Sequence, residues 1–456
     1  MLGKRTSIAI VGALLCGLTG VAMADTAAAL DTQALQAEMA SMRAEIAQLR
    51  HAQNDNWLNE RRAEEVKSLI REVLDDADTR ASLQGDGMLA GHDGKFFLAS
   101  ADGKFRLNVG GAIQFRYIYN SRDNSGVDDD VFGFQYRRNY LIFSGHVADP
   151  KIGYKVKLGA DRAHHNSDGD VNVEEMVLDN EITDGVVLYG GRTKAPLLRE
   201  ELTSATRQLA IERSLMNLTF STAYTEGVGL KIDPMENVKL DVMLNDGFGA
   251  ANYGTGADFN ADATDIAVTA RADILLAGDW GQMKDFTAWS GEEMALFFGA
   301  AVHYEVTESG DMQVANAAND DFVIWTVDGS LEYESWGLYG AVAGMHTDAV
   351  TGGTDLDHYG FLVQGSYNWN DELEPFVRYE HIDLDEDGGV FTHDVALLTF
   401  GANYYLRKHA SKLSLDVVWA LDSLDELATS DALGLLADAA GEEDQVAIRA
   451  QFQLLF

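Results

Sequence analysis

Cysteine and basic residues are scarce in this chain of 456 residues, and each shortage excludes a class of protein. Cys16 is the only cysteine, so internal disulfides, thiolate zinc sites and cysteine-ligated iron–sulfur clusters are ruled out. Lys and Arg number 34 against 73 Asp and Glu, a net charge of −39. Nucleic-acid binding needs clustered cations, so this balance argues against it. Hydrophobic residues make up 46%, too many for a disordered acidic chain.

Long hydrophobic runs are also missing, apart from one near the start. The apolar residues 8–21 follow Lys4 and Arg5 and precede the small residues of 22–24, which is typical of a secretory signal peptide over residues 1–24. The run is shorter than the ~20 residues that a spanning helix needs. An exported chain without a spanning helix is either soluble in the periplasm or a closed barrel in the outer membrane.

Residues 25–84 are predicted to form a periplasmic helical stalk. Apolar residues recur at alternating steps of four and three, at Leu35, Met39, Met42, Ile46 and Leu49. This spacing is the seam of a coiled coil. The alternative is an amphipathic helix that lies on its own domain. Glycines then mark a linker over residues 85–102, which leaves residues 103–456 for the main domain.

After the linker the hydrophobic period changes to two. In residues 105–119 (FRLNVGGAIQFRYIY) the odd positions are mainly apolar and the even ones mainly polar. Such a run exceeds the ~5–6 residues of an ordinary soluble strand and suits a tilted membrane strand. The chain also ends on an alternating strand that closes with Phe456, which resembles the assembly signal of bacterial outer-membrane barrels. An apolar face toward lipid and a polar face toward water predict a pore, and a barrel filled with aliphatic side chains would contradict it.

The repeated pattern predicts a definite number of strands. They fall at 104–119, 132–147, 151–161, 171–181, 185–193, 217–232, 237–246, 264–274, 295–306, 322–334, 336–346, 358–369, 374–384, 393–406, 411–421 and 445–456. The fold class is therefore all-β: a 16-stranded antiparallel transmembrane β-barrel preceded by a short N-terminal α-helical coiled coil. A barrel of this size leaves an aqueous channel. The connection 275–294 is long where a turn should be short, and the pattern gives no reason for it.

One segment carries a family resemblance. Residues 191–204 (GRTKAPLLREELTS), the later Glu212-Arg213-Ser214 and the pair Arg137-Arg138 resemble the phosphate-selective porin O/P family. Signal, stalk and barrel match the layout of that family, so the similarity covers nearly the whole chain. The resemblance implies a homotrimer in the outer membrane of a Gram-negative bacterium. It also implies a water-filled pore that is narrowed by a third loop folded inward, here about residues 194–215.

Basic side chains are concentrated in the inward loop and on the polar faces of the first strands. The predicted pore-lining, anion-guiding residues are Lys104, Arg106, Arg116, Arg137, Lys155, Lys157, Lys194, Arg199, Arg207 and Arg213. Fixed cations in a narrow wet channel attract anions without holding them too tightly. The alternative is that these cations neutralise nearby Asp and Glu and stiffen the wall.

Charge is divided unevenly along the barrel. Residues 95–231 carry 17 basic and 18 acidic side chains, whereas residues 232–456 carry 8 and 41. An acidic mouth repels anions, and salt weakens that repulsion. We therefore predict a general porin for small hydrophilic solutes and ions, with local anion guidance, rather than a channel dedicated to phosphate.

Other chemistry has little support in the sequence. Asp383, Asp385 and Asp387 match half of a calcium loop, but its twelfth position is Asp394 instead of Glu, and an ordinary acidic hairpin loop is the alternative. No other cofactor is expected. No catalytic motif occurs, so we predict that the chain is not an enzyme. The rival hypotheses are a surface hydrolase with scattered catalytic residues and a tether or adhesin whose stalk holds the cell wall.

Overall fold

The computed structural model describes residues 38–45, 88–123, 128–160, 171–247, 266–306, 320–349, 355–385, 394–424, 432–437 and 444–456. The chain divides into two units, Met1–Leu83 and Gln84–Phe456. In the first unit residues 38–45 are helical, and the predicted signal peptide lies outside the described residues. A helix this short does not show a coiled coil, so the stalk stays a prediction. None of the helices in the described ranges has the length and apolar character to cross a membrane.

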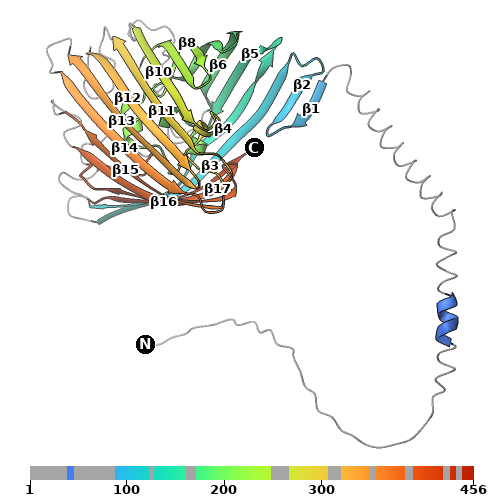
Figure 1. The fold of residues 1–456 in the computed structure, drawn as a ribbon. Coiled ribbons are helices and arrows are strands. Elements are labelled where there is room, and N and C mark those ends of the chain that lie inside the picture. The colour runs from blue at the N-terminus through green and yellow to red at the C-terminus, as the bar shows by residue number, and fades with distance from the viewer. Residues whose placement is uncertain are drawn as a thin grey trace, which may run out of the picture. The chain divides into compact units, whose positions relative to one another are not determined.

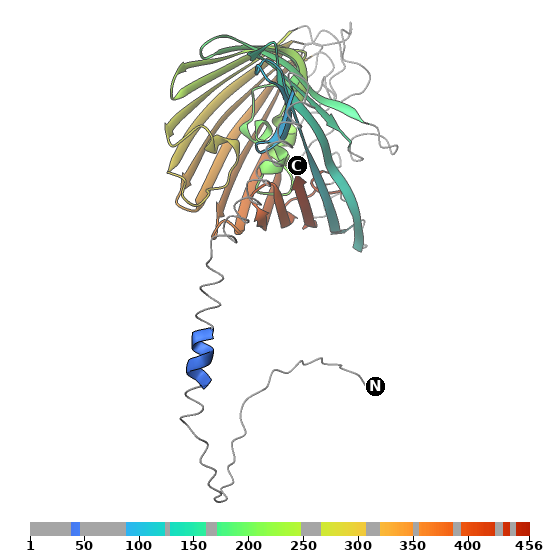
Figure 2. The same ribbon diagram turned by 90° about the vertical axis from the view of Figure 1, so that its right-hand side faces the viewer.

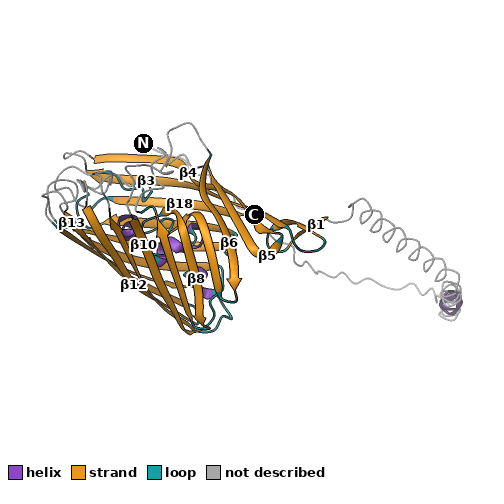
Figure 3. Ribbon diagram, turned by 90° about the horizontal axis from the view of Figure 1, so that it is seen from above, coloured by secondary structure: helices purple, strands orange, loops and turns teal. Residues whose placement is uncertain are grey.

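The second unit is a closed all-β barrel of 16 antiparallel strands, β3 to β18 (Figures 1 and 3). Each strand pairs with the next along the chain, and β18 pairs with β3 to close the ring. The strands are β3 (Arg106–Asp123), β4 (Asp128–Val147), β5 (Asp149–Gly159), β6 (Asn172–Thr183), β7 (Val186–Lys194), β8 (Tyr224–Met235), β9 (Val238–Asn245), β10 (Ile266–Ala277), β11 (Ala295–Val306), β12 (Asp320–Tyr333), β13 (Trp336–Ala349), β14 (Leu356–Tyr367), β15 (Leu373–Asp383), β16 (Val395–Arg407), β17 (Ser411–Ala420) and β18 (Val446–Leu455).

All the predicted strands are present, and their number is confirmed. The largest shift is in β8, which was expected from residue 217 and begins at Tyr224. The intervening chain forms the helix α4 (Leu215–Phe220), whose N-cap Ser214 accepts a hydrogen bond from the Asn217 backbone N–H. Serine is a favoured N-cap because it satisfies an amide that the helix leaves unpaired. This cap ends the extended pattern and starts a turn of helix instead.

Two short strands precede the barrel within the segment predicted as a linker. β1 (Met88–His92) and β2 (Phe96–Ser100) form a hairpin, and β2 pairs with the first residues of β3. β18 occupies the same edge of β3 farther along, from Ala112 onward. The hairpin therefore adds to the barrel sheet at the point where the last strand ends.

The outward faces of the strands are apolar, as the alternation predicts. On β11, for example, Phe298, Val302 and Tyr304 are exposed, while Phe297 and His303, on the opposite face, are buried. Exposed apolar side chains around a closed barrel face the hydrocarbon of a bilayer.

The inward faces differ between two regions of the barrel. Most inward side chains of β11 to β18, here called the covered wall, are buried, whereas most of those on β5 to β9, the exposed wall, keep partial exposure. The covered wall is buried because connections fold inside the barrel, including Leu433 and Leu435 between β17 and β18. Two longer ones are residues 195–223 between β7 and β8, here the constriction loop, and residues 278–294 between β10 and β11, here the inner turn. Figures 2 and 3 show the helices of the constriction loop inside the ring of strands.

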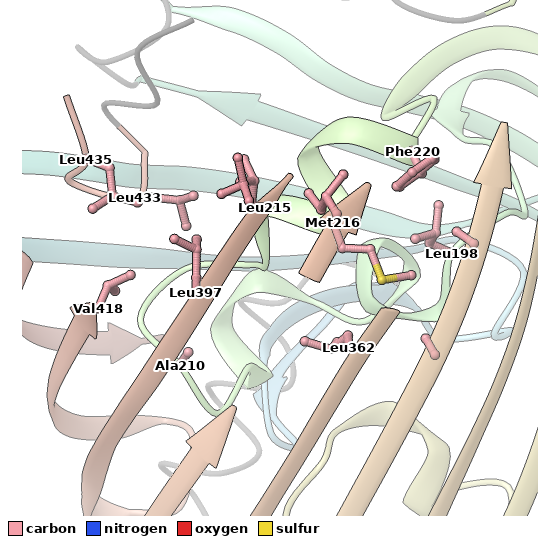
Figure 4. Close-up of a cluster of buried hydrophobic side chains, with 14 of the residues drawn as sticks. Leu198, Ala210, Leu215, Met216, Phe220, Leu362, Leu397, Val418, Leu433 and Leu435 are labelled. Carbon is pink, nitrogen blue, oxygen red and sulfur yellow. The ribbon is translucent and has the colours of Figure 1, made fainter. Parts of the chain in front are cut away.

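Apolar side chains fill the space between the constriction loop and the covered wall. Leu198, Met216 and Phe220 of the loop gather with inward residues such as Leu362 and Leu397 of the strands (Figure 4). The inner face carries polar residues on both walls, but it is hydrated on the exposed wall only, because polar residues of the covered wall such as Gln364, Asn403 and Gln453 are buried. On the covered wall the strands alternate between lipid and a packed loop, so both faces of those strands carry apolar residues.

Candidate channel constriction

A buried carboxylate fixes one end of the constriction loop to the barrel. The Glu212 side chain is 1% exposed and meets three guanidinium groups. Its Oε2 accepts from Arg137 Nε at 2.9 Å and from Arg138 Nη1 at 3.0 Å, and it lies 3.3 Å from Arg116 Nη1. Oε1 accepts a further hydrogen bond from Arg138. Charge-assisted contacts of this kind are roughly twice as strong as neutral hydrogen bonds.

Two adjacent arginines can reach one carboxylate only because the strand is irregular. Neighbouring residues of a regular strand point to opposite faces. The register between β3 and β4 shifts at Gln114 and Phe115, which pair with Arg138 and Tyr136 and leave Arg137 as an extra residue. This β-bulge turns both arginines inward. The bulge thus converts an Arg-Arg pair in the sequence into one binding site for Glu212.

Burial and charge act in opposite directions on the Glu212 carboxyl. Burial raises its pKa, but the charges of Arg138, Arg137 and Arg116 outweigh burial and hold the pKa well below the ordinary value of 4.5. The carboxylate is therefore ionised throughout the physiological range. Breaking such a buried pair leaves uncompensated charge and typically costs ~3–5 kcal/mol.

A second carboxylate holds the loop to itself. Glu201 Oε1 lies 2.8 Å from Lys194 Nζ, and its Oε2 lies 3.3 Å from Arg213 Nε and accepts from Asn217 Nδ2 at 2.8 Å. Burial raises the Glu201 pKa, but Arg213 and Lys194 reverse this effect and lower it to about 2. Glu200 accepts from the Ser214 backbone N–H at 2.9 Å. The beginning and the end of the loop are therefore tied together.

Polar groups of the covered wall bind the backbone of the loop between these ties. Gln453 Nε2 donates to Thr206 O, Lys412 Nζ to Gln208 O and Asn403 Nδ2 to Leu209 O, each at 2.9 Å. Asp416 accepts from the Ile211 backbone N–H at 2.9 Å and also binds Arg449. Where the loop packs against the wall, its buried backbone groups need such partners, because water is excluded from that contact. The loop is therefore part of the packed structure.

Arg199 has the most apolar surroundings of the predicted cations. Its side chain is 1% exposed and donates to Ser330, and its guanidinium carbon lies 5.3 Å from the Phe286 ring centroid, 5.2 Å from that of Phe297 and 5.6 Å from that of Tyr339. Burial lowers the Arg199 pKa. Cation–π attraction compensates part of the lost hydration.

Two lysines of the exposed wall pair with glutamates, and Lys155 keeps more contact with water than Lys157, whose side chain is 12% exposed. Lys155 Nζ is 2.6 Å from Glu175 Oε2, and the Lys155 side chain is 44% exposed. Lys157 Nζ is 2.8 Å from Glu174 Oε2 and 3.5 Å from the Tyr140 ring centroid. A second bulge, opposite Lys157, places Glu174 as the extra residue of β6. The two adjacent glutamates therefore pair with the two lysines of β5.

The predicted cations thus fall into three groups. The first group holds the constriction loop and comprises Arg116, Arg137, Lys194, Arg199 and Arg213. The second group lines the exposed wall and comprises Lys155 and Lys157. The third group lies elsewhere and comprises Lys104, Arg106 and Arg207. Lys104 is exposed beside Asp102 before β3. Arg106 pairs with Asp93 of the hairpin and lies over the Phe97 ring. Arg207 is partly exposed within the constriction loop.

Sequence reasoning missed several residues that build the site. It named the Glu212-Arg213-Ser214 motif but gave Glu212 no role, and it did not select Arg138. It also omitted Lys231 and Lys239, whose inward ammonium groups lie 4.8 Å from the ring centroids of Tyr189 and Trp280. Their alternation in β8 and β9 was the available signal.

The candidate calcium loop is only partly described. Asp383 and Asp385 are at the end of β15 and just beyond it, and Asp385 accepts a hydrogen bond from the Asp357 backbone N–H at 3.3 Å. Asp387 lies outside the described residues. Over the portion of the chain that is described, no group of three or more His, Cys, Asp or Glu side chains is arranged to hold a metal ion.

A closed barrel of 16 strands with a lipid-facing belt and a loop folded inside is the architecture of an outer-membrane porin, which is a channel. The model of the family described as phosphate-selective porin O and P matches residues 107–455, and the chain belongs to this family. The family resemblance read from the sequence is therefore confirmed, and the protein is an outer-membrane channel for small solutes.

Comparison with known proteins agrees on the fold. The anion-selective porin from Comamonas acidovorans is 14% identical, with 77% of this chain and 99% of that chain covered and a TM-score of 0.55. The outer-membrane channel DcaP of Acinetobacter baumannii is 11% identical, with 80% and 100% covered and a TM-score of 0.50. A protein of Aquifex aeolicus (strain VF5) is 22% identical over 347 residues, which cover 69% of this chain and 82% of that protein.

Proposed function

We propose that solutes cross this porin along the exposed wall, between β5 to β9 and the constriction loop. The observation that carries this proposal is the difference in burial between the two walls. The side chains of the covered wall are packed under the constriction loop and the inner turn, whereas those of the exposed wall keep contact with water. A hydrophilic solute follows the wetted surface, because it would lose its hydration in the packed half.

We further propose that the lysines of the exposed wall guide anions. The Lys155 side chain is 44% exposed, and Lys157, Lys231 and Lys239 are inward on the same set of strands. Pairing with Glu175 and Glu174 moderates their field, which fits weak attraction and easy release. Arg116 and Arg137 stay buried and paired with Glu212, and Arg199 stays buried among aromatic rings, so their charge acts on the loop more than on passing ions.

The remaining expectations belong to the same proposal. We infer that the protein forms a homotrimer, as the resemblance implies. Its outer face supports a protein contact at β4, where Phe132 and Phe134 are among the most exposed large apolar residues and Phe134 stacks on Phe115. Lipids would cover the rest of the belt. Residues 25–84 would then extend into the periplasm as a coiled coil that reaches toward the cell wall.

Planar-bilayer recording tests the route and the guidance together. Wild-type protein should form stable, ohmic channels, and their absence would contradict a channel. In a salt gradient Lys155→Gln should shift the reversal potential toward cation preference, because it removes one positive charge from the wetted wall. Lys104→Gln is the matched control, since Lys104 is exposed before the first barrel strand. Equal shifts in the two variants would place the route elsewhere.

A further inference from the structure

We propose that the inner turn is a second constriction, which limits solute size and supports the constriction loop. It starts from the opposite end of the barrel to the base of that loop. The inference deepens the proposed function, because it assumes that the barrel is a channel. Successive connections of an up-and-down barrel alternate between its two ends. The constriction loop joins β7 to β8 and the inner turn joins β10 to β11, so they start from opposite rims.

Barrel geometry does not require an inner turn of this length. Ala277 of β10 already pairs with Leu296 of β11, so the two strands are side by side where the turn begins and ends. Antiparallel neighbours can be joined by two residues. The connection between β6 and β7, at the same rim, uses only Asp184 and Gly185. The additional residues of the inner turn therefore do something other than link the strands.

The inner turn is bound inside the barrel along the covered wall. Thr287 Oγ1 donates to Glu374 Oε2 at 3.1 Å, and the Ala288 carbonyl accepts from Asn368 Nδ2 at 3.2 Å. Trp289 packs edge-on against Tyr405, with ring centroids 4.9 Å apart. Glu374 and Tyr405 are inward and buried, so the turn lies within the lumen and takes up space that water would otherwise fill.

The far side of the inner turn is fastened to two neighbouring turns. Asp285 Oδ2 lies 3.2 Å from His409 Nε2, in the connection between β16 and β17. The Ser290 backbone N–H donates to Asp371 Oδ1 at 2.8 Å, in the connection between β14 and β15. The inner turn therefore reaches from β10 to β17 along the rim and is tied at both ends.

Arg199 joins the inner turn to the constriction loop. It comes from the short helix α3 (Arg199–Leu202) of the loop, and its guanidinium faces the Phe286 ring of the inner turn. Its Nε and Nη2 have no hydrogen-bond partner, so the rings of Phe286, Phe297 and Tyr339 supply much of its stabilisation. Removing Phe286 would leave a buried cation with less support and loosen the start of the constriction loop.

The test replaces residues 279–293 by Asn-Gly, which favours a tight hairpin. Single-channel conductance and the size limit for neutral sugars in liposome swelling should both rise above the wild type. Unchanged values in a folded variant would overturn the inference. Wild-type protein without any conductance would instead overturn the proposed function.

A point variant keeps the test decisive if the shortened barrel does not fold. Phe286→Ala should raise the rate of tryptic cleavage at Arg207 in the constriction loop and increase current noise, because it removes the contact with Arg199. Ser290→Ala is the control within the same turn, since the Ser290 side chain is exposed and the backbone hydrogen bond of this residue to Asp371 is kept. Equal cleavage in the two variants would show that the inner turn does not support the loop.

Discussion

Glu212→Gln tests whether a single carboxylate holds the constriction loop. The substitution keeps the size of the side chain and removes its negative charge. Arg116, Arg137 and Arg138 would then face one neutral amide within a site that excludes water. The three cations repel one another, and the amide can offer only one oxygen as acceptor.

The expected loss follows from the burial of the pair. Removing one partner of a buried ion pair costs ~3–5 kcal/mol, because the other charge stays buried without compensation. Glu226→Gln is the control, since its partner Arg192 lies at 2.7 Å but both side chains are about one quarter exposed. A partly exposed pair of this kind contributes at most about 1 kcal/mol.

Two measurements separate loop release from a general loss of stability. Urea unfolding in lipid vesicles, followed by tryptophan fluorescence, gives the free energy of unfolding of each variant. Trypsin sensitivity at Arg207 reports on the loop alone. Glu212→Gln should be destabilised more than Glu226→Gln and cut faster. If both variants unfold and are cut alike, Glu212 does not anchor the loop.

The pH dependence of the wild type gives an independent check. The folded pKa of Glu212 lies below its ordinary value of 4.5, so its contribution is complete above pH ~4.5 and is lost as pH falls through the folded pKa. The difference between wild type and Glu212→Gln should therefore persist at neutral pH and shrink only in strong acid. A difference that disappears between pH 7 and 5 would refute the assignment.

Two further predictions concern other parts of the barrel. Burial lowers the pKa of His409 to about 4. Between pH ~6.5 and 4 the unfolded chain therefore binds a proton that the folded chain does not, so the free energy of unfolding should fall on acidification. His409→Gln should flatten this part of the pH profile of unfolding. Gly111→Ala would place a methyl group 2.4 Å from the Phe456 ring and 2.6 Å from the Tyr140 carbonyl oxygen. It should therefore weaken the pairing of β18 with β3 and slow folding into vesicles. Gly133→Ala is the control and should have neither effect, because its methyl group meets open space.

The sequence alone determined the barrel. Alternation with a period of two is a local property of each strand, and it located all the strands, their antiparallel order and the lipid-facing side. The signal for β8 was offset because Ser214 caps a helix at the residues where the apolar pattern continues. The resemblance of 191–204 and of Glu212-Arg213-Ser214 then pointed to the porin family and to a loop folded inward.

Only the tertiary structure decided how the inside is used. The sequence could list Arg137 and Arg138 but could not show that a bulge turns both toward Glu212, because a bulge is set by the pairing of two strands. It could note that residues 275–294 are too long for a turn, but the reason is their contacts with Glu374, Tyr405 and His409, which lie far along the chain.

This difference between what the sequence and the tertiary structure determine has a physical cause. Whether a strand faces lipid depends on side chains next to one another in the chain, so the pattern can be read directly. Whether a lysine or an arginine faces water or a carboxylate depends on where an inserted loop packs against strands that can be 205 residues away, as with Ile211 and Asp416. The sequence therefore predicted the strands that form the channel wall, and the tertiary structure determined which charged side chains face the channel.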